Sequence, residues 1–500
     1  MREFTIIAVL AALAAPAYGE DASPTRAKEE LGEVSFETSC AEAAAAPFER
    51  GLLLLHHMMY RQSAAAFEEA AAADPDCAMA QWGIAMTKFH PLWPGGPTPE
   101  ETAAGRTAAE QLAAMTPGSE REAAFVEAVL AFYSGEDVPY RERLAAWAKA
   151  QRALAETYDD PDARAFASLA QLTVAPRGAD AVPDLIEAGE RMDALRREAP
   201  GHPGAYHYAI HAYDHPALAE RGLEVARAYV AIAPEVPHAL HMPTHIFTRL
   251  GLWEEAIDLN VRSAAAVLNE LDQGDGVIAT HHPHAIDYAV YAHLQLGQLA
   301  KAKEVLAGLD EHGNLEDSFG TAYAAAAAPS RLPLEEDDWE TAARLPTDIH
   351  SAVTWDRYPQ AVAIRWFAKG LGAARSNDVA AAREALKELA LLGDAMRERD
   401  ATYWLSLLDA QTKAIEGWIA HSEGDDETAV ALISEAADIE DGVGKAPVTP
   451  GHVLPARELL GDLLQEIGRM EEAAQAYEAC LEASPNRRRS VAGLAIVSAR

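Results

Sequence analysis

Apolar and polar residues follow the period of an amphipathic α-helix along most of this chain. In the segments 120–133, 141–158 and 379–392, apolar side chains recur every three or four residues, and alanine fills many of the other positions. This spacing places the apolar side chains on one face of a helix. The pattern therefore predicts an all-α protein with almost no β-strand.

The clearest internal repeat lies in segment 459–485, LLGDLLQEIGRMEEAAQAYEACLEASP. Small residues, an aromatic residue and a proline stand there at fixed intervals, namely Leu460, Gly461, Gly468, Ala473, Tyr477 and Pro485. This order resembles the tetratricopeptide pattern, in which small residues let two helices approach and an aromatic side chain fills the joint. The resemblance predicts a tetratricopeptide-like α-solenoid of antiparallel helix pairs that forms a curved superhelix.

The same scheme recurs elsewhere in the chain. Segments 237–266 and 283–309 each place a glycine at the turn between two helices, Gly251 in the first and Gly297 in the second. Turn-forming residues predict loops at 94–97, 273–276, 328–338 and 441–450. The resulting division is a leader (1–19), N-terminal repeats (20–195), central histidine-rich repeats (196–310), an insertion or irregular segment (311–375) and C-terminal repeats (376–500).

The first residues, MREFTIIAVLAALAAPAYGE, have the features of a removable signal peptide. A short charged start precedes an apolar run from Ile6 to Ala15, and small residues around Tyr18 fit a cleavage site. The run is too short to span a bilayer, and no later segment approaches about 20 unbroken apolar residues. We expect an exported protein, periplasmic or secreted, without a membrane span.

The acidic balance narrows the range of partners. The chain has 41 Lys and Arg against 78 Asp and Glu, a formal net charge of −37, and the acidic residues are spread along the helices. Such a field repels nucleic acid and anionic lipid and favours cations. We expect no nucleic-acid partner, whereas a metal ion or a cationic ligand or peptide in the groove fits the charge. Acidity can also serve solubility alone.

Three cysteines, Cys40, Cys77 and Cys480, leave two interpretations open. In an oxidising compartment, Cys40 and Cys77 would join the first helix pair by a disulfide and leave Cys480 unpaired. Alternatively, all three are buried thiols.

Histidines recur at the repeat period. Stretch 203–211, PGAYHYAIH, and stretch 237–245, PHALHMPTH, align without gaps at an offset of 34 residues, which is the tetratricopeptide period. The equivalent pairs are His207 with His241 and His211 with His245. Residues four apart share one helical face, and packed helices lie about 8–10 Å apart. Four imidazoles are therefore expected to converge.

The groove-lining positions of the tetratricopeptide fold hold further polar residues. A third copy of the stretch, at 283–291, carries an aspartate in place of the first histidine. The candidate metal ligands on this concave face are His207, His211, His215, His238, His241, His245, His284 and Asp287. The same positions hold His56, His90, Glu458 and Asp462 in the outer repeats. The alternative interpretation is a polar ladder of imidazoles and tyrosines that keeps adjacent helices in register.

Pro243 lies inside the predicted helix that carries His241 and His245. A proline there removes a hydrogen bond and clashes with the carbonyl of Ala239, so the helix should bend between the two histidines. Such a bend is expected where side chains must be aimed, and the alternative is a shift of the chain into a looser turn.

The ligand types indicate a class of metal. Imidazoles with a few carboxylates and no thiolate suit zinc, copper, iron or nickel better than calcium or magnesium. The H-E-x-x-H signature of zinc proteases is absent, as are a Walker loop, a dinucleotide fingerprint, a serine elbow and a haem attachment motif. Three functions follow: a metal-binding solenoid that is an enzyme or a carrier, a metal-free peptide-binding scaffold, and a metal-free acid–base enzyme in which Asp214 or Asp287 orients an imidazole.

Long stretches of the chain resemble a family of bacterial secreted tetratricopeptide proteins with histidine-rich repeat helices. The strings that carry the resemblance include HPGAYHYAIHAYDHP, PHALHMPTHIFTRLGLWEEAIDLN, HHPHAIDYAVYAHLQLGQ and the terminal SPNR. They cover most of the chain from Ser35 to Arg487, apart from the stretch around 312–355. The resemblance implies the helical fold and export, and it implies no activity.

Overall fold

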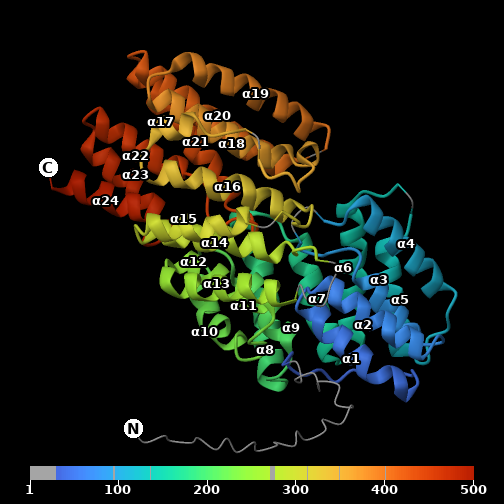
Figure 1. The fold of residues 1–500 in the computed structure, drawn as a ribbon. Helices are drawn as coiled ribbons and strands as arrows, with labels where there is room; N and C mark the ends of the chain where they lie inside the picture. Colours follow the sequence, from blue (N-terminus) through green and yellow to red (C-terminus); the bar gives the residue numbers. More distant parts are fainter. Residues whose placement is uncertain are drawn as a thin grey trace, which may run out of the picture. The chain divides into compact units, whose positions relative to one another are not determined.

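Helices that lie side by side and are joined by short turns make up the described part of the chain (Figure 1). The computed structural model describes residues 30–93, 96–135, 137–270, 276–311, 313–347, 349–399 and 401–499. The predicted signal peptide, residues 1–19, lies outside the described residues.

The helices alternate with turns in one continuous series. They are α1 (Glu42–His56), α2 (Tyr60–Ala73), α3 (Ala78–Met86), α4 (Pro99–Ala113), α5 (Glu120–Tyr133), α6 (Tyr140–Thr157), α7 (Pro161–Val174), α8 (Val182–Glu198), α9 (Pro203–Tyr213), α10 (Ala219–Tyr229), α11 (Pro237–His241), α12 (Pro243–Leu250), α13 (Trp253–Glu270), α14 (His281–Gln295), α15 (Leu299–Asp310), α16 (Phe319–Glu335), α17 (Trp339–Ala343), α18 (Pro359–Arg375), α19 (Val379–Arg397), α20 (Thr402–Ser422), α21 (Asp426–Val443), α22 (Ala456–Glu466), α23 (Met470–Ala483) and α24 (Arg488–Ser498). Short 3-10 turns occupy Gly178–Ala181 and Trp355–Arg357.

Extended pairing is almost absent, as expected from the sequence. Within the described ranges, the β-structure is a single isolated bridge between Ile278 and Leu315. The helices α13, α14, α16, α18 and α20 contact one another in that order. In the described residues, no helix is both long and apolar enough to cross a bilayer. The prediction of an all-α solenoid of helix pairs is confirmed.

Local side chains set several helix ends. At the start of α4, the Thr98 hydroxyl accepts a hydrogen bond from Glu101 N, and the Glu101 carboxylate accepts one from Thr98 N. Pro203 and Pro237 stand in the first turns of α9 and α11, as predicted. Gly251 ends α12 in the left-handed conformation, with φ 65°.

The predicted loop at 328–338 is wrong, because α16 continues to Glu335 through Pro329 and Pro333. This helix contacts α14 and α18, and its alanines at 322 and 324–328 are buried. Burial between two helices outweighs the local cost of the prolines. The segment 311–375, expected as an insertion or irregular, contains the whole of α16, α17 and α18.

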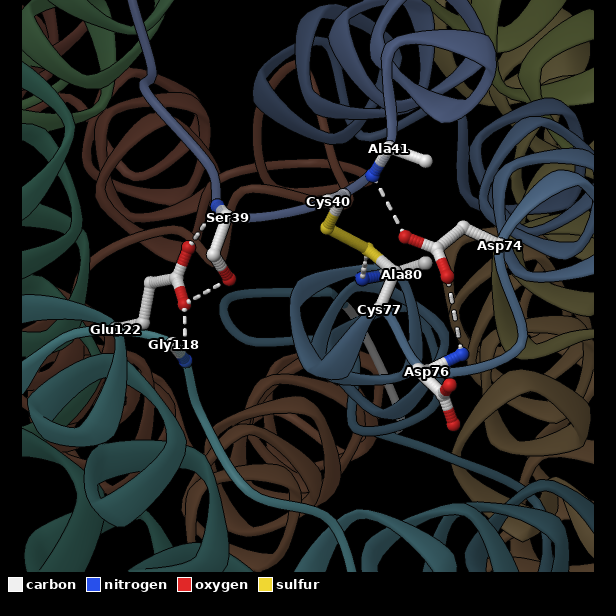
Figure 2. Close-up of a disulfide and its surroundings, with 9 residues drawn as sticks. All are labelled: Ser39, Cys40, Ala41, Asp74, Asp76, Cys77, Ala80, Gly118 and Glu122. Carbon is white, nitrogen blue, oxygen red and sulfur yellow. Dashed lines mark hydrogen bonds between the residues drawn. A yellow bond between two sulfur atoms is a disulfide. The ribbon is translucent and has the colours of Figure 1, made fainter.

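A disulfide joins Cys40 to Cys77 (Figure 2), so the first of the two cysteine interpretations is confirmed. Hydrogen bonds also hold the segment 39–41 that precedes α1. Ser39 donates from its N–H and its hydroxyl to the Glu122 carboxylate, and Ala41 N donates to Asp74 at 2.7 Å. Cys480 is a free, buried thiol.

Candidate metal centre

The histidines of α9, α11, α12 and α14 meet in the interior of the fold. Helix α12 contacts α9, and α11 contacts α14, so equivalent faces of successive repeats adjoin. The side chains of His207, His238, His241 and His245 are all buried. The expected convergence therefore occurs, although His211 and His284 are only partly buried.

The break predicted at Pro243 is present. Helix α11 ends at His241 and α12 begins at Pro243, with Met242 between them. Across this break, the His241 and His245 rings lie 4.9 Å apart between centroids and are nearly perpendicular, at 81°. Their edges can thus point at one shared position.

The first three-imidazole group consists of His241, His245 and His284. One ring nitrogen of each lies within 4.8 Å of the other two. The Nε2 atoms of His241 and His245 are 3.0 Å apart. Two imidazoles that bind one ion at about 2.0–2.1 Å place their nitrogens about 3 Å apart, so this pair has the spacing of two ligands of one metal.

Hydrogen bonds at the opposite ring nitrogens fix the protons of this pair. His245 Nδ1 donates to Asp214 Oδ2 at 2.9 Å, because a carboxylate can only accept. His241 Nδ1 donates to Asn260 Oδ1 at 2.7 Å, since Asn260 Nδ2 is committed to the Ala256 carbonyl. Both neutral rings then present an Nε2 lone pair to the other. Two facing lone pairs repel unless a cation lies between them.

The second three-imidazole group consists of His207, His211 and His238, again with one nitrogen of each within 4.8 Å of the others. His207 Nδ1 donates to the His56 carbonyl at 2.6 Å, which directs its Nε2 lone pair toward His211 Nε2 at 3.2 Å. His238 is buried, and in the described part of the chain neither of its ring nitrogens has a hydrogen-bond partner. An unsatisfied buried imidazole is costly unless a ligand completes it.

The two groups adjoin and face one cavity. Ring centroids are 6.1 Å apart between His238 and His241, and 6.3 Å apart between His211 and His245. The cavity is partly open to solvent. It is lined by imidazoles of both groups and by apolar side chains, which include Met58, Leu92, Trp93, Met242, Pro447 and Val448.

The segment between α21 and α22 covers this cavity. Lys445 Nζ forms an ion pair with Asp214 at 3.3 Å. Tyr288 donates its hydroxyl to the carbonyls of Pro447 and Thr449, at 2.9 and 3.0 Å. We name residues 444–455 the cover segment. It was predicted only as a loop, and it begins well over 100 residues after the end of α14, the last of the histidine helices.

Asp287, predicted as a ligand, is held elsewhere. Its Oδ1 accepts a hydrogen bond from Arg331 Nε at 3.1 Å, and both side chains are fully buried. The same guanidinium donates to Thr449 Oγ1 and to the Gly451 carbonyl. Asp287 thus anchors Arg331, and Arg331 anchors the cover segment, so the carboxylate supports the site without reaching it.

Other predicted residues also lie outside the two groups. His215 is half-buried in the turn after α9, where its Nδ1 accepts from Ala217 N at 3.2 Å. Glu458 is fully buried against Arg487 and Arg489, at 2.9 Å from each. Asp462 binds Arg489 at 2.6 Å. The two arginines neutralise the charges of Glu458 and Asp462, because burying an ionised carboxylate without a cation is costly.

His56 takes part in a separate buried cluster. Its Nε2 lies 2.8 Å from Asp162 Oδ1, and His202 Nε2 lies 3.2 Å from the same oxygen. Burial raises the pKa of Asp162, but the hydrogen bonds from the two imidazoles outweigh it and hold that pKa below its usual range. Asp162 Oδ2 and His202 Nδ1 have no hydrogen-bond partner among the described residues, so this buried group is a further set of potential metal ligands. His90 stacks on Tyr60 at 4.4 Å between centroids.

Burial keeps the imidazoles neutral. It lowers the pKa of His211 to about 3 and holds the pKa of His238, His241 and His284 well below the ordinary value. Burial acts in the opposite direction on Asp214, but Lys445 and Arg249 outweigh it and hold the pKa of this carboxyl well below its usual range. The site therefore presents neutral imidazole nitrogens as ligands, and the ionised Asp214 carboxylate lies behind one of them.

Sequence reasoning missed several residues of the site. His281 contacts His238, at 5.0 Å between centroids, and Trp93 lies 5.1 Å from His281. Only the doubled histidine before Pro283 could have indicated His281. Helix α14 starts there, two residues earlier than the alignment of the prolines predicts. Asn260 and Lys445 gave no signal, since neither recurs at the repeat period.

Comparison with known proteins supports the fold class. Residues 454–487 match the tetratricopeptide repeat model. The match covers one repeat, and the described helices pair in the same way along the chain, so the fold is a tetratricopeptide-like helical array. No curated protein matches the sequence of this chain.

Among solved structures, the chain is similar to a Rap protein complexed with competence and sporulation factor, with a TM-score of 0.41 and 10% identity over 91% of this chain and 100% of that one. The APC/C hetero-tetramer Cut9–Hcn1 gives a TM-score of 0.38 and 12% identity over 91% and 76%. Yeast Tom70 gives 0.32 and 12% over 92% and 89%.

Proposed function

We propose that this protein binds transition-metal ions through its two three-imidazole groups. The observation that carries the proposal is the pair of Nε2 atoms of His241 and His245, 3.0 Å apart, whose opposite nitrogens both donate to fixed acceptors. Metal-binding histidines commonly donate their other N–H to a carboxylate or carbonyl, which sets the tautomer. His207 repeats this arrangement with the His56 carbonyl.

The chemistry of the ligands favours zinc, copper or iron. Neutral imidazoles suit these ions, and three of them leave a coordination position open for a small molecule or water. That position would face the cavity, whose walls are largely apolar. An ion there could polarise or activate a bound small molecule. We therefore favour a resident metal that acts on a small ligand over a cargo metal that exchanges at the surface.

A peptide-binding role for the histidine face is less well supported. The cover segment binds Asp214 through Lys445 and receives the Tyr288 hydroxyl, so it occupies the space that an extended peptide would need. A protein partner of the tetratricopeptide array would bind another face.

We also propose that the protein works in an oxidising compartment. The Cys40–Cys77 disulfide supports this proposal, because such bonds persist in secreted and periplasmic proteins and are rare in the cytosol. Thiol labelling of the protein in intact cells tests it: Cys480 alone should remain a thiol after unfolding, and three labelled thiols would contradict it.

Metal content is the direct test of the proposed function. Untagged protein is incubated with zinc, copper or iron salts, passed through a desalting column and analysed for metal. We expect about one retained equivalent for each three-imidazole group. The His241→Ala/His245→Ala variant should lose one equivalent with unchanged helicity, and the matched control His421→Ala, on α20, should lose none. No retained metal in the native protein, or equal retention in the double variant, would contradict the proposal.

A further inference from the structure

A second cavity lies among α16, α18, α20 and α21, in the C-terminal half of the array. Its lining residues come from all four of these helices and from the cover segment. The aromatic side chains of Tyr323, Phe367 and Trp404 form part of its wall. Leucine, isoleucine and methionine side chains form much of the rest, so most of the wall is apolar.

One carboxylate lies in this apolar wall. Glu440 of α21 lines the cavity and is 6% exposed. Its Oε2 accepts a hydrogen bond from Ala456 N at 2.6 Å. Its Oε1 lies 3.8 Å from His452 Nδ1, which is beyond hydrogen-bond distance. Among the described residues, no lysine or arginine forms an ion pair with Glu440.

An unpaired carboxylate at this depth needs an explanation. Burying an ionised carboxylate without a cation costs several kcal/mol, so proteins normally pair it, as Glu458 is paired here with two arginines. Burial raises the pKa of Glu440 to about 8, and the more distant Arg487 and Arg457 offset this only in part, so the carboxyl is protonated near neutral pH when the cavity is empty. A ligand that carries a positive charge would supply the missing partner.

We propose that this cavity binds a small organic cation, a protonated amine with an apolar body. The ammonium group would donate to Glu440 Oε1, and the side-chain carbonyls of Gln360 and Gln411, which also line the cavity, offer further acceptors. The apolar body would contact the rings of Tyr323, Phe367 and Trp404, whose faces attract cations and apolar groups alike. The lining residues include no lysine or arginine that would repel such a ligand.

The test compares one amine with its uncharged analogue on the full chain. 2-Phenylethylamine and 2-phenylethanol have the same apolar body, and calorimetric titration measures their binding to native protein near neutral pH. A charge-assisted hydrogen bond to a buried carboxylate should make the amine bind about tenfold more tightly or better. Equal affinities for the two compounds, or no binding of the amine, would overturn the proposal.

Variants assign the preference to Glu440. Glu440→Gln keeps the size of the side chain and should reduce the preference for the amine to less than about twofold. The matched control is Glu435→Gln, on the same helix, where the glutamate faces solvent and pairs with Lys413; it should bind like the native protein. A Glu440→Gln variant that keeps the full preference would overturn the proposal. If Glu440→Gln fails to fold, the relative affinities of native protein for 2-phenylethylamine and 2-phenylethanol still test the proposal.

Discussion

The proton on His241 is set by one amide. Asn260 turns its oxygen to His241 Nδ1 because its nitrogen is bound to the Ala256 carbonyl, and this leaves Nε2 unprotonated toward His245. Thr244 donates its hydroxyl to the His241 carbonyl at 2.7 Å, next to the same amide. Such acceptors behind a ligand raise its basicity and fix its orientation.

Replacing Asn260 with leucine should therefore weaken metal binding. The acceptor is lost, His241 can take the wrong tautomer, and we expect the affinity to fall by about 10- to 100-fold. Competition with a chromophoric chelator measures the change. Asn260→Asp, which keeps an acceptor at Nδ1, should fall much less. Equal affinities of Asn260→Leu and native protein would show that the amide does not set the tautomer.

The sequence predicted the site residues correctly where two successive repeats carry histidines at equivalent positions. His207, His211, His241 and His245 were found because a 34-residue offset fixes their register. Asp287 occupies the same register, yet its partner Arg331 lies on a helix that the sequence pattern predicted as a loop. A register position shows which way a side chain points, but only the neighbouring helices determine what it meets.

At the scale of elements, the cover segment closes the site from far along the chain. It is tied to α14 by the Tyr288 hydroxyl, to α16 by Arg331 and to the turn after α9 by Lys445. Tyr403 also donates to the Gly444 carbonyl at 2.8 Å. Local propensity could predict the helices, because their periodicity is local, but the docking of this segment depends on contacts between residues more than 100 positions apart.

Tyr288→Phe should loosen the cover segment without removing a ligand. Two hydrogen bonds to the segment are lost, so chelator should extract bound metal faster, by about twofold to tenfold, while the amount of bound metal stays the same. Stopped-flow mixing with chelator gives the rate. Tyr477→Phe, whose hydroxyl binds Asp462 in another repeat, is the control. An unchanged extraction rate would show that the segment does not limit access.

The disulfide should stabilise the first helix pairs and leave the metal centre intact. It closes a loop with a sequence separation of 37, so Cys40→Ala/Cys77→Ala should lose about 2–4 kcal/mol of unfolding free energy. Urea denaturation followed by circular dichroism measures the loss, and Cys480→Ala controls for removal of a buried thiol. A loss of metal in the double variant under native conditions would contradict the separation of these two roles.

The whole molecule buries many imidazoles away from water, which makes its stability depend on pH. Burial lowers the pKa of His57 and of His452 to about 4, whereas in the unfolded chain each titrates near 6.5. As pH falls from about 6.5 to about 4, the unfolded chain takes up protons that the folded protein does not. The free energy of unfolding should therefore fall over this window.

Urea denaturation of metal-free protein between about pH 7 and about pH 5 checks this prediction. His57→Gln should show a shallower decrease in stability over the same range, because one group with a lowered pKa has been removed. Stability that is constant or rises toward pH 5 would mean that the buried imidazoles are protonated in the folded state.

X-ray absorption spectroscopy of the metal-loaded protein tests directly whether the imidazoles of the two histidine groups bind the metal. We expect the metal to have nitrogen or oxygen ligands at about 2.0–2.1 Å and no sulfur ligand. The outer-shell scattering should correspond to about three imidazoles per ion. The His241→Ala/His245→Ala variant should lose that imidazole scattering at one group only. A shell dominated by carboxylate and water oxygens, with no imidazole signature, would mean that the metal binds the acidic surface and that the histidines serve packing alone.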